Sequence, residues 1–322
     1  LSDLKTEVNG VRTTGSVTAD FGRQKPDFEF SIRMAELDFS RLTGQKTGTG
    51  SKTGIPGGSQ KSWNFSAMKD FSAKGTLSAG SAVFGKITIR DLQCPLHLSD
   101  GRLTVSGLTG DFYGGTLSLN GHAVFDKGVS FGGQMAVRKF SLGDVMRAFG
   151  ATSLITGQAA LSADVTGSMS GPDQLTSGLN GTAHFTSGQG SFQSVDKEGK
   201  PKGRPTVFRE SSGSGTITSG VLRTQDFQLK GDSMKVNGTG KFDLNTQTMN
   251  LDLNVDMPGL PLIPVYVHGP FSNPKTVVNG GKVILNTFGS LAKGVFGIFG
   301  GVFNLFRHDN GNSHSGEESD VY

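Results

Sequence analysis

The sequence predicts a mainly β protein: a long, curved antiparallel meander sheet that forms an apolar groove or an incomplete sandwich. Apolar residues recur at every second position over most of the chain, which sends them to one face of a sheet. Glycine accounts for 49 of the 322 residues, about twice its usual share of roughly 7%, and is spread through turns and strand ends. A sustained helical period appears near the C-terminus, so we expect few short helices and one C-terminal amphipathic helix.

The organising stretch is residues 86–124, which reads as three strands separated by turns. Ser99-Asp100-Gly101 supplies a hairpin turn, because glycine accepts positive φ and aspartate bonds its own backbone. The alternating apolar residues of this stretch are Ile87, Ile89, Leu96, Leu98, Leu103, Val105, Leu117 and Leu119.

Before this stretch, residues 8–34 predict two strands around a loop at residues 22–25. Residues 43–60 are rich in Gly, Ser, Thr and Lys and almost free of apolar side chains, so we expect a flexible linker. Residues 63–71 fit either a short helix or an extended lead-in to the sheet.

After it, residues 129–137 predict a strand and residues 143–149 a short helix, capped by Ser141 or Asp144. Residues 157–167 alternate again, with Leu161 and Val165 on the apolar face. Residues 182–192 fit a hairpin through Gly188, and residues 195–205 a polar, basic loop.

The meander continues through residues 216–262. Phe227 and Leu229 mark one strand of it. The most regular alternation runs from Met249 to Met257 and includes Leu251, Leu253 and Val255.

Residues 283–306 change to a helical period, with apolar residues in an arc of roughly 160° and a length of about 36 Å. Lys293 and the wide polar arc argue against a transmembrane span. Docking on the protein's own sheet and lying in a membrane interface both remain open. The membrane-facing candidates are Phe288, Leu291, Val295, Phe296, Phe299, Val302, Phe303 and Phe306. Residues 308–322 predict a disordered polar tail.

No catalytic constellation is recognisable, and we expect neither an enzyme nor a metal or cofactor site. The six histidines are widely spaced and no HExxH or GxSxG motif occurs. Residues 80–86 match GxxxxGK superficially, but Ile87 stands where a phosphate-binding loop needs Ser or Thr. The net charge of +4 is dispersed, which argues against nucleic-acid binding. Cys94, the single cysteine, is expected to be a packed side chain.

Several segments carry a family resemblance. Residues 92–125 contain the run DGRLTVSGLTGDFYGGTLSLNG, residues 170–175 read SGPDQL, and residues 261–275 read PLIPVYVHGPFSNPK. These glycine and apolar spacings resemble the C-terminal region of the AsmA family, envelope proteins of Gram-negative bacteria related in kind to bridge-like lipid transfer proteins. The resemblance implies a periplasmic protein that carries phospholipid between inner and outer membranes and supports outer-membrane biogenesis. It also implies an inner-membrane anchor outside this chain, and it allows envelope protein partners.

The division expected is a preceding AsmA-like β segment (1–42), the linker (43–60), the C-terminal β domain (61–280), the helix (281–307) and the tail (308–322). Because the chain begins with Leu1 inside a strand pattern, we expect it to be the C-terminal part of a longer protein.

Many one-sided strands and few helices leave three ways to cover the apolar face: closure as a sandwich, packing on helices, or an external guest. Physical reasoning alone leaves sandwich and lipid groove open, and the resemblance favours the groove. Its candidate lining is Ile87, Ile89, Leu96, Leu98, Leu103, Val105, Leu117, Leu119, Leu161, Val165, Phe227, Leu229, Leu251, Leu253 and Val255. The alternatives are a periplasmic assembly factor offering edge strands to outer-membrane proteins and a purely structural β-sandwich.

Overall fold

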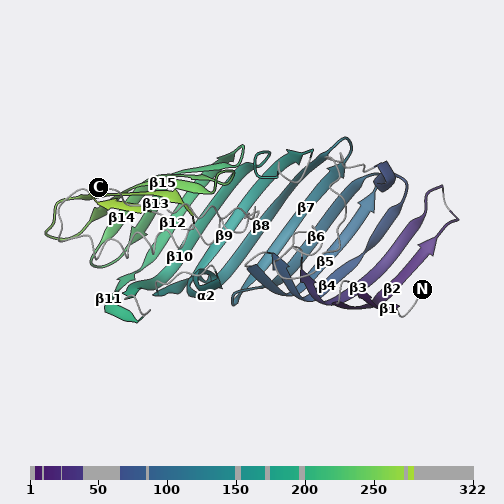
Figure 1. Ribbon diagram of the computed structural model, residues 1–322, viewed down its shortest axis with the longest axis horizontal. Helices are drawn as coiled ribbons and strands as arrows, with labels where there is room; N and C mark the ends of the chain where they lie inside the picture. Colours follow the sequence, from purple (N-terminus) through teal and green to yellow (C-terminus); the bar gives the residue numbers. More distant parts are fainter. Residues whose placement is uncertain are drawn as a thin grey trace, which may run out of the picture.

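The computed structural model describes residues 4–8, 11–22, 24–38, 66–84, 87–148, 154–170, 175–195, 200–271 and 275–278. Within them, seventeen strands form one sheet that is not closed, which confirms the predicted mainly β meander (Figure 1). The strands are β1 (Leu4–Val8), β2 (Val11–Asp20), β3 (Asp27–Asp38), β4 (Ser72–Phe84), β5 (Ile87–Ser99), β6 (Arg102–Phe112), β7 (Gly115–Phe125), β8 (Val129–Ser141), β9 (Leu154–Met169), β10 (Asn180–Val195), β11 (Pro201–Phe208), β12 (Glu210–Thr218), β13 (Val221–Lys230), β14 (Lys235–Asp243), β15 (Thr248–Asp256), β16 (Ile263–Pro270) and β17 (Lys275–Val278). A 3-10 helix, η1 (Ser66–Lys69), precedes β4, and one α-helix, α2 (Leu142–Ala148), follows β8.

Consecutive strands pair antiparallel almost throughout, so the sheet grows in the order of the chain (Figure 1). One pair departs from this rule: β3 and β4 are parallel, with Asp27 opposite Ser72. A second irregularity is at β10, which pairs with β11 along one half and with β12 along the other. Among the described residues, β1, β11 and β17 each pair with a single strand, so the sheet stays open and the sandwich considered from the sequence is not what it forms.

Tight turns of one kind set the register of three hairpins. Asp100 and Gly101 both have positive φ, 51° and 73°, between the paired residues Ser99 and Arg102. This two-residue type I′ geometry matches the twist of the flanking strands and confirms the predicted turn. Tyr113-Gly114 and Ser219-Gly220 repeat the same pair of positive φ values.

The alternation predicted from the sequence is the alternation of burial in the structure. In β15, Met249, Leu251, Leu253 and Val255 are buried, and the residues between them are exposed. The polar faces keep their side chains in water, while the apolar face supplies the main core cluster.

Helix α2 agrees with the predicted short helix. The Ser141 hydroxyl accepts a hydrogen bond from the Asp144 backbone N–H at 3.2 Å, which identifies Ser141 as its cap. Leu142, Val145 and Met146 are buried in the core cluster, and the helix packs against β9 and β8.

The predicted hairpin at residues 182–192 is wrong, because β10 runs unbroken over Asn180–Val195. Its register against β9 shifts between Ser187 and Gly190, so the glycines there accommodate a bulge instead of a chain reversal. The predicted polar loop at 195–205 is also too long, since β11 begins at Pro201, where a proline can open a strand.

The predicted linker (43–60), the C-terminal helix (281–307) with its eight membrane-facing candidates, and the polar tail lie outside the described residues. The 63–71 segment is described from Ser66, where it forms η1. The division into domains stays a prediction; within the described part, β1–β3 and β4–β17 belong to one hydrogen-bonded sheet.

Candidate functional site

The apolar face contains a continuous row that crosses the sheet from strand to strand. Each member is paired with the next across the ladder, and every member is apolar or glycine. The row runs Val17, Phe30, Gly75, Leu96, Val105, Gly121, Gly133, Val165, Gly181, Ile217, Leu222, Phe242, Met249 and Gly269. At roughly 4.8 Å per strand, these fourteen positions span about 60 Å.

The neighbouring row, one residue along each strand, is polar and lies on the opposite face. It runs Asn120, Gln134, Asp164, Thr182, Thr216, Arg223, Lys241, Asn250, His268 and Lys275. The Gln134 side chain donates to Asp164 at 2.9 Å, and the Tyr266 hydroxyl donates to Asn250 at 3.2 Å. The two rows together define a sheet with one apolar and one hydrophilic side over most of its length.

The fifteen predicted lining residues occupy the apolar phase of their strands, but the structure divides them into two groups. Ten are buried: Ile87, Ile89, Leu98, Leu117, Leu161, Phe227, Leu229, Leu251, Leu253 and Val255. Five are half-buried: Leu96, Leu103, Val105, Leu119 and Val165. The half-buried group gathers on β5, β6, β7 and β9, where Phe131 and Met135 of the intervening β8 are also half-buried. We name these seven residues the central apolar patch.

Glycines let aromatic rings lie flat on this face. Phe30 is paired with Gly75, Phe131 with Gly167, and Phe208 with Gly190. A Cβ on any of these glycines would collide with the ring of its partner; at Gly75 it would lie 2.7 Å from Cδ2 of Phe30. The absent side chains therefore make room for the rings across the ladder.

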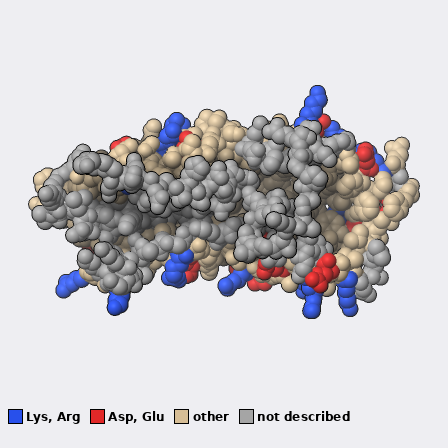
Figure 2. Space-filling view, in the orientation of Figure 1, with Lys and Arg blue, Asp and Glu red and all other residues tan. Residues whose placement is uncertain are grey.

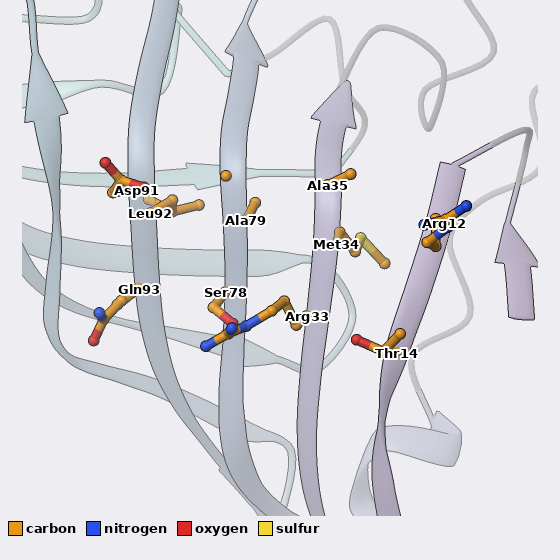
Figure 3. A pocket seen from close by; sticks show the side chains of 11 residues that line it. Arg12, Thr14, Arg33, Met34, Ala35, Ser78, Ala79, Asp91, Leu92 and Gln93 are labelled. Atoms are coloured by element: carbon orange, nitrogen blue, oxygen red, sulfur yellow. The ribbon is translucent and has the colours of Figure 1, made fainter. Parts of the chain in front are cut away.

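The two described depressions are lined by polar and apolar residues together, the first including Met34 and Leu92 and the second Met135 of the central apolar patch. One, of about 430 Å³, is lined from β2, β3, β4 and β5 by residues that include Arg12, Thr14, Arg33, Ser78 and Gln93 (Figure 3). A second, of about 330 Å³, is lined from β7 to β10 and includes Asn120, Asp164 and His184. None of the fifteen predicted lining residues borders either depression.

Ion pairs tie the loops together at the strand ends that carry the Asp100-Gly101 turn. Lys25, between β2 and β3, reaches Asp100 at 2.5 Å, and Lys69 of η1 reaches Asp126 at 2.7 Å. Hydrogen bonds from these lysines hold the pKa values of both carboxyl groups below their usual range. Figure 2 shows charged side chains along both long margins of the face in view.

Chemically reactive groupings are scarce in the described part of the chain. No set of three His, Cys, Asp or Glu residues there is placed to hold a metal ion. No helix that the structure describes is long and apolar enough to cross a membrane. Cys94 is buried on the apolar face, and this burial raises the pKa of its thiol.

Sequence reasoning missed several members of the row, among them Val17, Phe30, Ile217, Leu222 and Phe242. Each lies in the apolar phase of its strand, but membership of a lateral row depends on register, which turns and bulges set. The glycine members were not recognised either, although they occur in the same alternating phase as the apolar residues.

No curated protein and no solved structure matches the chain. The family model described as "AsmA family" matches residues 4–227, which is more than half of the sequence. The match covers β1 to most of β13, including the parallel junction of β3 and β4 and all of the central apolar patch. The chain belongs to the AsmA family.

Proposed function

We propose that this chain is an envelope lipid-transfer protein whose open sheet carries phospholipid acyl chains along its apolar face. It would act in the periplasm of a Gram-negative bacterium, between inner and outer membranes, and support outer-membrane biogenesis. Family membership is consistent with an envelope role in lipid transport or biogenesis.

The observation that supports this proposal best is the lateral apolar row. A fatty acyl chain has no hydrogen-bonding groups, so it needs a continuous track free of polar side chains. Fourteen successive strands provide such a track, and the polar row beside it projects to the opposite side. An acyl chain lying across the strands would thus meet apolar groups where the row keeps some accessibility, while Ile217, Leu222, Phe242 and Met249 of the row are buried.

The central apolar patch is the part of this face that we assign to direct lipid contact. Its side chains keep some accessibility, whereas the ten buried candidates would support the floor around them. Aliphatic side chains measure only the thickness and length of a guest, so the binding would discriminate poorly between headgroups. The mechanism is passive sliding without bond chemistry, and the protein is not an enzyme.

Membrane attachment completes the proposal. We expect an inner-membrane anchor N-terminal to this sequence, and we assign the segment 283–306 to the membrane interface through its phenylalanine-rich side. Replacing Phe296, Phe299 and Phe303 together with Asp tests this segment, and unchanged liposome association would remove it from the membrane role.

Mass spectrometry of organic extracts from the purified protein tests lipid carriage. We expect phospholipid in stoichiometric amount, and less of it after Val105→Asp, which puts a charge in the central apolar patch. The matched control is Thr104→Asp, a neighbouring substitution on the opposite face of β6. A lipid-free wild-type protein, or equal loading of both variants, would contradict the proposal.

The sheet edges favour a second candidate, an assembly factor for outer-membrane proteins. In the described part, β1 pairs with β2 and β17 with β16, and the described ladders give neither a second partner strand. Exposed edges can accept an incoming strand. Binding of unfolded outer-membrane protein that is lost in Val277→Pro, on β17, would support this function over lipid carriage.

A further inference from the structure

The connection between β15 and β16, residues Met257–Leu262, has an unusual composition. Its sequence is Met-Pro-Gly-Leu-Pro-Leu, without a charged, hydroxyl or amide side chain. Every other fully described connection between consecutive strands carries such a group: Asp100, Tyr113, Asp126, Arg209, Ser219, Asp232 and Asn245. We name residues 257–262 the apolar tip.

The backbone holds this tip in a defined shape. The Leu260 N–H donates to the Met257 carbonyl oxygen at 3.1 Å, and Gly259 has a φ of +80°. Proline followed by a positive-φ glycine is the signature of a type II turn. Pro258 and Pro261 fix two further backbone angles. Leu260 and Leu262 are consequently presented to solvent by a stiff loop, at 49% and 60% exposure.

The tip continues the apolar face at the C-terminal end of the described sheet. Val255 and Ile263, the last pair of the β15–β16 ladder, are buried on that face, and Met257 is half-buried against the same core. Seven large hydrophobic side chains are exposed among the described residues, and four of them lie between residues 260 and 277. These four are Leu260 and Leu262 of the tip and the paired residues Tyr266 and Val277, which lie in the polar phase of β16 and β17.

We propose that the apolar tip inserts into the interface of a lipid bilayer. Two leucines on a six-residue loop fall far short of the roughly 800 Å² per partner that a specific protein interface buries. The tip also has no polar side chains to give such an interface directional hydrogen bonds. A bilayer requires neither, and a preorganised loop loses little conformational entropy on insertion. The contact needs only a membrane, and holds whether or not the sheet carries lipid.

Nearby charges predict the lipid dependence of this contact. Arg209 pairs with Asp232 at 3.3 Å, and Lys230 pairs with Glu210 at 2.9 Å, on the strand and turn residues of the same sheet end. Paired charges leave little net attraction for anionic headgroups. Insertion of the tip therefore depends on apolar contact, and its contribution to binding should be nearly independent of salt.

Co-sedimentation of the full chain with phosphatidylcholine vesicles tests the proposal. We expect Leu260→Ser/Leu262→Ser to reduce the partition coefficient at least about tenfold at both low and high salt. The control is Leu175→Ser, which removes a leucine of 43% exposure elsewhere on the surface, and it should bind as the wild type does. Because all three leucines are exposed, the variants should unfold at the wild-type denaturant midpoint.

A spectroscopic readout locates the insertion. Leu262→Trp in a Trp63→Phe background should show blue-shifted emission on adding vesicles, and Leu175→Trp in the same background should not. The proposal would be overturned by any of three results: wild-type protein that does not bind neutral vesicles, a double variant that binds as well as the wild type, or tryptophan emission at position 262 that does not shift. Lipid extraction from the double variant distinguishes membrane insertion by the tip from lipid carriage by the sheet. The amount of phospholipid that co-purifies with this variant should equal that of the wild type.

Discussion

Replacing Gly167 with alanine should destabilise the sheet because of one aromatic ring. Gly167 on β9 is paired with Phe131 on β8, and the ring of Phe131 occupies the space above the glycine. An added Cβ would lie 2.8 Å from Cε1, 3.0 Å from Cε2 and closer still to Cζ. Carbon atoms prefer about 3.5–4.0 Å, so the ring must move by about 1 Å.

Two opposing effects set the magnitude. Overpacking of this kind costs about 1–3 kcal/mol, whereas replacing glycine inside a strand returns about 0.5–1 kcal/mol. We expect Gly167→Ala to lower the free energy of unfolding by about 0.5–2 kcal/mol. In a Phe131→Ala background the ring is absent, and Gly167→Ala should raise the free energy of unfolding by about 0.5–1 kcal/mol.

Urea denaturation followed by far-ultraviolet circular dichroism, at constant m-value, measures all four members of this cycle. Gly188→Ala is the matched control, because Gly188 also lies inside a strand and a Cβ there meets no atom within 4 Å; its free energy of unfolding should rise by about 0.5–1 kcal/mol. An effect of Gly167→Ala with the same sign and size in both backgrounds would refute the role assigned to the ring. An unchanged free energy of unfolding for Gly167→Ala in the wild-type background would also refute it.

Three further predictions concern buried and paired groups. Ser187 and Ser211 are buried and share a hydrogen bond of 2.7 Å, so Ser187→Ala should cost about 1–3 kcal/mol by leaving Ser211 without its partner. The double alanine variant should cost less than the two single variants summed, and denaturant midpoints that simply add would contradict this. Hydrogen bonding to Lys25 lowers the pKa of Asp100 in the folded state, so the stability that it contributes is fully present above the unfolded pKa of about 4. That contribution disappears as the pH falls through the lower pKa of the folded state. The urea midpoints of the wild type and Asp100→Asn should therefore differ at neutral pH and converge in acid. A difference in midpoint that stays constant with pH would argue against the Lys25–Asp100 pair. Burial raises the pKa of the Cys94 thiol, so at pH 8 a disulfide reagent should modify it at least about tenfold more slowly than in the urea-unfolded chain; equal rates would show that the thiol is accessible.

Local sequence patterns predicted the strands well where alternation and turn chemistry agree. Residues 248–256 alternate without interruption and form β15 with every second residue buried. Asp100-Gly101 has the composition that a type I′ turn demands, and Ser141 precedes a helix that needs a cap. At these positions, local conformational preference and tertiary packing favour the same residue types.

The prediction failed where a glycine is needed for close packing and not for a turn. Gly188 was predicted to be the turn of a hairpin, yet β10 continues through it, and nearby Gly190 makes room for the ring of Phe208. The parallel pairing of β3 with β4 had no local signal either, because residues 27 and 72 are far apart in the sequence. A long-range pairing of this kind depends on the whole sheet.

For the candidate site, alternation identified the face but not the differences within it. The sequence gives Leu96 and Leu98 the same phase of the same strand, but Leu98 is buried and Leu96 half-buried. Which residues of a face keep some accessibility depends on what packs against each part of it. The exposed leucines of the apolar tip were not predicted, because residues 261–275 were interpreted as a closing strand that resembles a family motif, and the loop before this strand was not recognised.

The meander also affects how the length of the protein can change. Each strand is hydrogen-bonded to its immediate neighbours, and most neighbours are consecutive in the chain. Such an assembly behaves almost one-dimensionally, with stability summed over adjacent interfaces. Duplication or loss of one hairpin would lengthen or shorten the sheet by about 10 Å and leave distant ladders intact. Evolution can in this way change the length of such a sheet one hairpin at a time without redesigning the rest of it.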